Sequence, residues 1–191
     1  MKTYRNNILS VLRLAVLTAA WVFIALHSFA QIPTNQDCLG AIPICSNTYT
    51  VSFNHNGMGN FPSEIFNVSS CYAPEQRSVW LKFTVQQAGL LRYSITPLNA
   101  NQDHDWTLFD MTSTSCAQLA TSVGASGAMA RSNTWGVFGA NGPTGVSTPN
   151  GGFGICNGPG NLNGPQWNAD LPVAAGSSYY LHITNWTGTV Y

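Results

Sequence analysis

The sequence has little charge and few basic residues. Only 7% of the residues are Asp, Glu, Lys or Arg, and Lys and Arg together number 7. A nucleic-acid-binding protein needs a basic face that neutralises phosphates, so the composition excludes nucleic acid as a partner. Asn, Ser, Thr and Gly supply the polarity instead, which is typical of an extracellular β protein with long hydrogen-bonded loops.

The chain also lacks the motifs of common hydrolases. It contains no Gly-x-Ser-x-Gly elbow and no His-Glu-x-x-His pair, so neither a serine nucleophile nor a zinc-bound water is indicated. Glu64 and Glu75 have the chemistry of a glycosidase pair, but both stand in turn-like segments near prolines, which favours a structural role. His104 is expected to point away from its acidic neighbours. We therefore predict that the chain is not an enzyme.

An N-terminal targeting segment precedes the part that folds. Basic residues open the chain, an apolar run follows over residues 14–26, and Ser28-Phe29-Ala30 offers a small-x-small cleavage site. This order predicts a secretory signal peptide over residues 1–30 and a β-sandwich domain over residues 31–191. The alternative is a membrane anchor, but the apolar run is shorter than the roughly 20 residues of a spanning helix. We expect a secreted or outer-surface protein with no stable membrane span after cleavage.

Five cysteines follow this segment: Cys38, Cys45, Cys71, Cys116 and Cys156. Cysteines of exported proteins generally form disulfides, and no CxxC pair or Cys/His spacing indicates a zinc site. Because five is odd, at least one thiol is left over. A single sequence does not give the connectivity. We favour a bond between Cys116 and Cys156, which would close the long loop between them.

Alternating apolar and polar residues predict short β-strands separated by turns. The runs cover residues 48–53, 78–85, 90–96, 106–111 and 178–184. The second and third runs are joined by a short Gly-containing linker, which predicts a β-hairpin. In the last run we expect Tyr179, Leu181 and Ile183 to face inward and Tyr180, His182 and Thr184 to face outward.

The remaining segments contain little regular pattern. Gly, Asn, Ser and Pro dominate residues 124–164, which predicts a long loop with short strands inside it. Residues 112–119 are expected to make one helical turn. Short strands with turns between them predict an all-β fold, an antiparallel jelly-roll-like β-sandwich. Thr189-Val190-Tyr191 resembles the start of a strand, so we expect the domain to be truncated at its C-terminal strand.

An acidic turn leads into the strand over residues 106–111. Alternate residues of an extended chain point to the same side, so the carboxylates of Asp103 and Asp105 can converge on one ion. Calcium prefers about six to eight oxygen ligands, and carbonyl oxygens of Asn99 and Asn101 would add to the set. With Asp110, these aspartates form a candidate calcium site, and calcium is the only cofactor that the sequence suggests. The alternative is a solvated turn whose carboxylates cap backbone amides.

Three tryptophans lie in loop-like segments: Trp135, Trp167 and Trp186. Exposed aromatic rings near Asn and Asp side chains stack on sugar rings through their large apolar faces. These residues are therefore candidate ligand-binding positions, and the partner would be an extracellular glycan or a surface protein. The alternative is that the rings plug the ends of the sandwich.

Several segments, taken in order, resemble a known family. They are Cys38-Leu39-Gly40-Ala41-Ile42-Pro43-Ile44-Cys45, Ser78-Val79-Trp80-Leu81-Lys82-Phe83-Thr84-Val85, residues 89–97, residues 103–110, Gly151-Gly152-Phe153-Gly154 and residues 175–181. The set resembles an N-terminal β-sandwich module of large secreted proteins associated with gliding motility and type IX secretion. It is also similar to pre-peptidase C-terminal domains of secreted peptidases. The resemblance implies a jelly-roll-like sandwich outside the cell, a binding or spacing role, and further repeats with a sorting domain downstream.

These observations leave three functional hypotheses open. The first is a non-catalytic adhesion or ligand-binding module at the cell exterior, within a larger protein. The second is an accessory domain of a secreted hydrolase or peptidase, and the downstream reading frame distinguishes it from the first. The third is a carbohydrate-binding domain, for which glycan binding is the test.

Overall fold

The computed structural model describes residues 31–51, 56–62, 64–65, 75–99, 102–122, 129–133, 142–158 and 164–187. The signal peptide predicted for residues 1–30 and the final strand predicted from residue 189 lie outside the described residues. Within the described ranges, no helix has the length and apolar character needed to cross a membrane. From Pro33 onward the described residues belong to one compact unit.

Strands dominate the described residues, and the all-β prediction is confirmed. The strands are β1 (Ile42–Pro43), β2 (Ser78–Thr84), β3 (Gly89–Leu91), β4 (Tyr93–Ile95), β5 (His104–Asp110), β6 (Met129–Asn133), β7 (Thr144–Val146), β8 (Cys156–Asn157), β9 (Trp167–Asn168), β10 (Leu171–Val173) and β11 (Ser178–Asn185). Two 3-10 turns, η1 (Cys38–Gly40) and η2 (Thr148–Asn150), and one short helix, α2 (Cys116–Ser122), complete the described elements. The described parts of the predicted loop over residues 124–164 therefore hold three short strands, β6, β7 and β8, as expected.

Helix α2 replaces the single helical turn predicted for residues 112–119. Its N-terminus is held by the Ser-x-x-Gln spacing of Ser115 and Gln118. The Gln118 Oε1 atom accepts from Ser115 N at 2.8 Å and from Ser115 Oγ at 3.0 Å. This satisfies one of the backbone N–H groups that a helix start leaves without an intrahelical partner.

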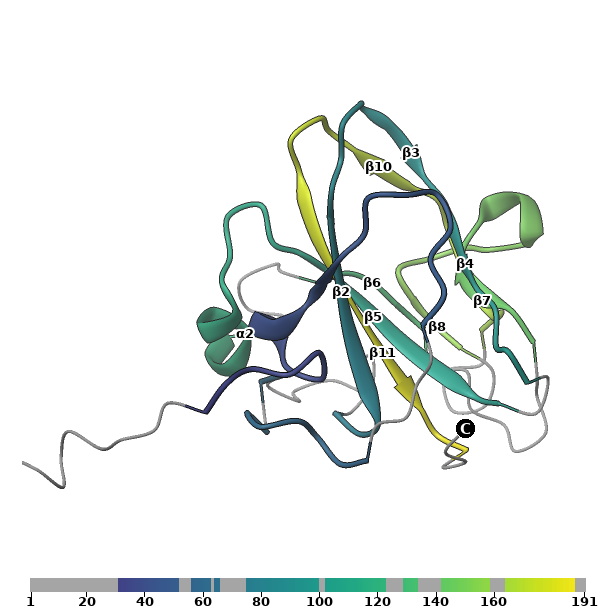
Figure 1. Cartoon of the computed structure of the whole chain (residues 1–191). Helices are drawn as coiled ribbons and strands as arrows, with labels where there is room; N and C mark the ends of the chain where they lie inside the picture. The colour runs from purple at the N-terminus through teal and green to yellow at the C-terminus, as the bar shows by residue number, and fades with distance from the viewer. Residues whose placement is uncertain are drawn as a thin grey trace, which may run out of the picture. The chain divides into compact units, whose positions relative to one another are not determined.

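The largest sheet is built around three long strands that lie side by side (Figure 1). Its strand order is β1-β2-β11-β5-β6-β8, and β11 is antiparallel to both of its neighbours. The register places Leu181 of β11 opposite Leu81 of β2 and opposite Leu108 of β5. Three of the five predicted strands are these long strands, and alternation located them because each buries a regular series of apolar side chains.

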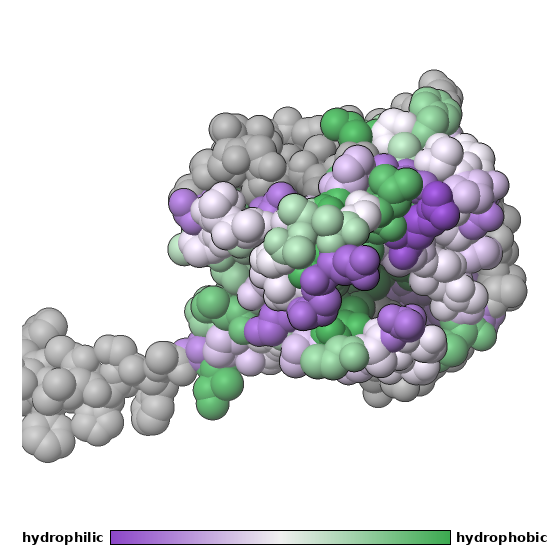
Figure 2. Space-filling model, turned by 90° about the horizontal axis from the view of Figure 1, so that it is seen from above, coloured by the Kyte–Doolittle hydropathy of each residue, from purple (hydrophilic) through white to green (hydrophobic). Residues whose placement is uncertain are grey.

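Two small sheets complete the described architecture. β3 pairs with β10 in one, and the other has the order β4-β7-β9. The hairpin predicted from residues 78–85 and 90–96 is therefore wrong, because β2 pairs with β11 instead and the second run divides between the two small sheets. On the side seen in Figure 2, hydrophobic and hydrophilic residues are interspersed. Leu90 of β3 is 58% exposed.

One face of the large sheet packs against the small sheets. Its buried cluster comprises Val79, Leu81, Trp106, Leu108, Val146, Tyr179, Leu181 and Ile183. Trp106 lies at the contact: its Nε1 donates to Thr144 Oγ1 of β7 at 3.0 Å, and its ring meets Tyr93 edge-on at 5.3 Å between centroids. The inward direction predicted for Tyr179, Leu181 and Ile183 is confirmed.

The opposite face of the large sheet is also buried, which the alternation did not predict. A second cluster there comprises Cys38, Ala41, Ile65, Trp80, Phe109, Met111, Cys116 and Leu119. His182 and Thr184 belong to this face and are 0% exposed, so their predicted outward direction is wrong. Tyr180 is half-buried against the same cluster. A polar residue in an alternating strand faces solvent only when no other segment covers that face.

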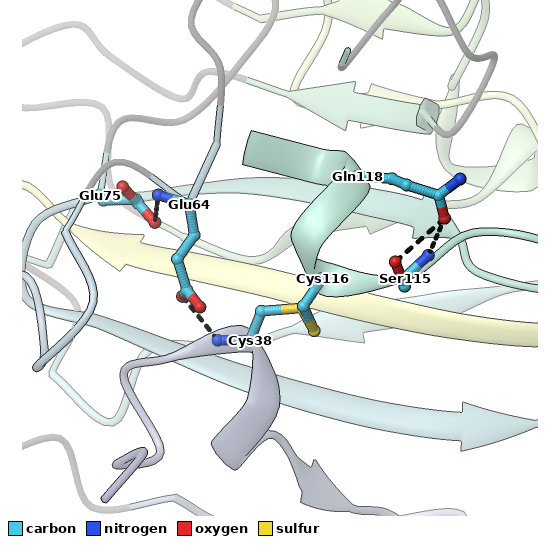
Figure 3. The surroundings of a disulfide bond; sticks show 6 residues. All are labelled: Cys38, Glu64, Glu75, Ser115, Cys116 and Gln118. Carbon is cyan, nitrogen blue, oxygen red and sulfur yellow. Dashed lines mark hydrogen bonds between the residues drawn. A yellow bond between two sulfur atoms is a disulfide. The ribbon is translucent and has the colours of Figure 1, made fainter. Parts of the chain in front are cut away.

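A disulfide joins the N-terminal segment to α2. Cys116 is bonded to Cys38, with the two Cα atoms 5.7 Å apart (Figure 3). The predicted Cys116–Cys156 bond is therefore wrong, and Cys156 takes part in a different disulfide. Cys45 is an exposed free thiol, which confirms that at least one cysteine is left over. The predicted pairing failed because η1, remote in sequence, crosses next to the start of α2.

Buried carboxylates organise the N-terminal segment in place of secondary structure. Asp37 accepts from Thr34 N at 2.6 Å and from Phe61 N at 2.8 Å. Glu64 accepts from Cys38 N at 2.6 Å, and its own N donates to Glu75 at 3.0 Å (Figure 3). Among the described residues of this segment, only residues 42–43 form a strand, so the strand predicted for residues 48–53 is absent over its described part, residues 48–51.

Candidate ligand-binding site

Three of the predicted site residues, Asp103, Asp105 and Trp186, lie at one end of the large sheet, where β5 begins and β11 ends. The antiparallel register places Asn185 opposite His104. One residue further, Trp186 N donates to the carbonyl oxygen of Asp103 at 2.9 Å. The aspartate and the tryptophan, which the sequence indicated separately, are therefore neighbours. We call Asp103, Asp105, Asn185 and Trp186 the β5–β11 end.

Trp186 is the exposed aromatic residue of this site. Its exposed fraction is 45%, and it follows directly on the last residue of β11. The chain is fixed at this point because Asn185 Oδ1 accepts from Thr187 N at 3.1 Å and from Thr187 Oγ1 at 2.6 Å. The indole is thus held on the end of a buried strand with much of its surface in solvent.

Asp103 supplies a carboxylate beside this indole. Burial raises the pKa of Asp103 to about 6, because a charged carboxylate loses hydration inside the protein. Its Oδ1 atom is buried and has no hydrogen-bond partner among the described residues. A hydrogen-bond donor or a cation supplied by a ligand would offset the free-energy cost of burying this carboxylate.

Arg77, which directly precedes β2, contacts the β5–β11 end. Its Nη1 donates to the carbonyl oxygen of Asn185 at 3.4 Å, and its backbone N donates to Gly57 O at 2.7 Å. Arg77 has a φ of 44°, a left-handed conformation that is uncommon for residues other than glycine. The sequence did not indicate Arg77 or Asn185, because neither belongs to a motif and only the tertiary fold brings them to this end.

The three aspartates of the candidate calcium site are not brought together. Asp105 is 4% exposed, lies opposite Thr184 of β11 and follows Asp103 by two residues. Asp110 lies at the far end of the same strand, roughly 16 Å from Asp105 at about 3.3 Å per residue. There it accepts from Thr112 N at 3.0 Å in a local turn. No group of three or more His, Cys, Asp and Glu side chains suited to a metal occurs among the described residues.

The other predicted tryptophans do not join the site. Trp167 is 7% exposed and belongs to β9, so its role is that of a core residue. Trp135 lies outside the described residues. Of the three candidates, Trp186 has the exposure that a stacking residue needs.

The titratable residues that the sequence raised as catalytic alternatives are buried. His104 is 3% exposed, and burial lowers its pKa to about 4. Glu64 and Glu75 are each 8% exposed, and each carboxylate accepts a hydrogen bond from a backbone N–H. Burial, aided by the negative charges of Glu75 and Asp37, raises the pKa of Glu64 to about 7 although the bond from Cys38 lowers it.

Comparison of the chain with protein-family models, with curated proteins and with solved structures gives no match. The geometry of the β5–β11 end therefore carries the functional argument.

Proposed function

We propose that this chain is a non-catalytic ligand-binding or adhesion module of a larger protein that acts outside the cell. The observation that carries the proposal is the juxtaposition of the exposed Trp186 and the half-buried Asp103 at the end of the large sheet, where a backbone hydrogen bond joins the two residues. Sites of this kind bind by stacking on the apolar face of a ring and by accepting hydrogen bonds from its hydroxyls. Neither step requires a nucleophile or a proton transfer.

The ligand class that fits this pair best is a carbohydrate. A pyranose ring has an apolar face that covers an indole, and its hydroxyls donate to carboxylate oxygens. The half-buried Asp103 supplies a carboxylate for such a bond, and its buried Oδ1 atom lacks a partner among the described residues. A jelly-roll-like sandwich, to which we assign the fold, would present this end as a loop-rich rim away from its core.

Binding to a glycan array tests this function. Trp186→Ala and Asp103→Asn should each lower the affinity for the glycans bound by the wild-type chain by about tenfold or more, the loss expected for a stacking contact or a charged hydrogen bond. Tyr49→Ala is the matched control, because Tyr49 is 44% exposed and lies in the N-terminal segment. Absence of any glycan signal from the wild type would reject a carbohydrate ligand.

Calcium is a second candidate ligand of the same end. Asp103 and Asp105 would supply carboxylate oxygens, while Asn99, whose carbonyl already accepts from Gln102 N at 3.0 Å, would supply a backbone oxygen. A cation here would lower the pKa of Asp103 that burial raises. Because a ligand that binds only the folded state raises its melting temperature, an equal melting temperature with calcium and with chelator would reject the site.

A further inference from the structure

Four buried polar side chains form a continuous patch on the face of the large sheet that carries His182 and Thr184, and the patch borders the β5–β11 end because Thr184 lies opposite Asp105. The register pairs Ser78 with Thr184 and Trp80 with His182. Directly opposite residues in an antiparallel sheet have Cβ atoms about 4.5–5.5 Å apart, and alternation places all four on the same face. Each of them is 0% exposed. We call these four residues the polar patch.

The polar patch contains more unpaired atoms than a folded protein usually leaves buried. Ser78 Oγ, Trp80 Nε1, Thr184 Oγ1 and both ring nitrogens of His182 have no hydrogen-bond partner among the described residues. Native proteins leave only a few buried polar atoms unpaired for every hundred residues or so. Five such atoms on adjacent positions of two paired strands call for a common explanation.

The donors and acceptors of the polar patch complement one another through water. Burial lowers the pKa of His182 to about 3, so its neutral ring has one donor and one acceptor nitrogen. The two hydroxyls each donate and accept, and the indole donates. A buried water molecule needs about two to four polar partners, and the polar patch offers that number within the spacing of adjacent strands.

Neighbouring rings fix the polar side chains in place. The ring of Trp80 stacks on Phe109 at 5.6 Å and lies 4.7 Å from the ring of His182. The imidazole is therefore held by packing on its Trp80 side and cannot turn freely to find another partner. Asp105 and Thr107, also buried, continue the same face on β5.

We propose that the polar patch is an internal hydration site, in which ordered water molecules bridge Ser78, His182 and Thr184. The site lies next to the β5–β11 end on the same face of the sheet, but its hydration does not depend on the ligand-binding function proposed above. The bound water is part of the folded core of the large sheet, since it satisfies groups that the protein itself leaves unpaired.

Magnetic relaxation dispersion of water nuclei counts long-lived internal water and tests the proposal on the full chain. The wild type should show at least one long-lived water that the Ser78→Ala/Thr184→Val double variant loses. The matched control is Thr84→Val, because Thr84 lies on β2 and its hydroxyl contacts Ser178 Oγ at an exposed position. The control should keep the water count of the wild type.

Thermal melting separates a hydrated site from a dry one. In a hydrated site, Thr184→Val removes a satisfied hydroxyl and should lower the melting temperature. Ser78→Ala should then lower the melting temperature less in the Thr184→Val background than in the wild type, because both hydroxyls bind the same water molecule. A rise in melting temperature in Thr184→Val, or a water count in the double variant equal to that of the wild type, would overturn the proposal.

Discussion

The central strands of the large sheet and the N-terminal segment over residues 33–65 are stabilised in opposite ways. β2, β5 and β11 are joined by continuous backbone ladders and bury side chains on both faces. The described parts of the N-terminal segment have one two-residue strand, and carboxylates with a disulfide hold them instead. The first mode is cooperative and apolar, whereas the second consists of a few charged and covalent contacts. The two regions should therefore be destabilised by different kinds of substitution.

The largest expected effect is loss of the disulfide that holds the N-terminal segment. Cys38 and Cys116 are separated by 78 residues in sequence, and a loop of this size stabilises by about 4 kcal/mol in the chain-entropy account. Replacing both cysteines by serine should lower the free energy of unfolding, measured in guanidinium chloride, by up to that amount. Cys45→Ser is the control, since its free thiol is exposed. An unchanged denaturation midpoint in the double variant would show that the contact is dispensable.

A cavity in the large sheet should lower the free energy of unfolding by nearly as much as loss of the disulfide. Leu108 lies in β5, which pairs with β11 on one side and β6 on the other, and it is 0% exposed. Leu108→Ala should lower the free energy of unfolding by about 2–5 kcal/mol, as other buried leucines do. Leu90→Ala, at a position that is 58% exposed, should change it by less than about 1 kcal/mol. Similar losses at both positions would contradict the assigned core.

The two regions should respond to pH with opposite signs. The folded pKa of Glu64 is raised to about 7, so its contribution to stability is full below pH about 4.5 and is lost as the pH rises through 7. The folded pKa of His182 is lowered to about 3. Its contribution is full above pH about 6.5 and is lost as the pH falls toward 3.

Variants separate these opposing contributions. Between pH 4.5 and 7, Glu64→Gln should make the free energy of unfolding rise more steeply with pH, by on the order of 1–2 kcal/mol relative to the wild type. His182→Phe should make it fall with rising pH over the same range. Gln still accepts from Cys38 N, so the first variant removes charge and keeps the hydrogen bond. Parallel pH profiles for both variants and the wild type would rule out the two assignments.

The smallest expected effect concerns a contact outside both regions. Arg92 and Asp170 form an ion pair at 2.6 Å between the small sheets, with the Arg92 side chain 51% exposed. Exposed ion pairs contribute little and are screened by salt. Arg92→Gln should therefore lower the melting temperature less than any variant above, and the difference from the wild type should vanish in high salt. A larger effect that persists in high salt would show that Arg92 has another role.

The candidate site shows which features of a binding site residue patterns can predict and which they cannot. Asp103 and Trp186 were both indicated by their chemistry, one as part of an acidic turn and one as a loop aromatic. Their adjacency is a product of the β5–β11 register and of the backbone bond beyond it. Trp167 looked equivalent in sequence but packs into β9, since loop-like composition does not reveal which segment a later strand covers.

The sequence by itself determined the all-β class, the positions of the three long strands and the inward series Tyr179, Leu181 and Ile183. These follow from side-chain alternation, which is a local property of each strand. Only the tertiary structure decided that β2 pairs with β11, that Cys116 bonds to Cys38, and that His182 and Thr184 are buried. Strand pairing, disulfide partners and burial of a second sheet face depend on which distant segments come into contact. The free energy of those contacts depends on both segments, so no single stretch of the chain determines it.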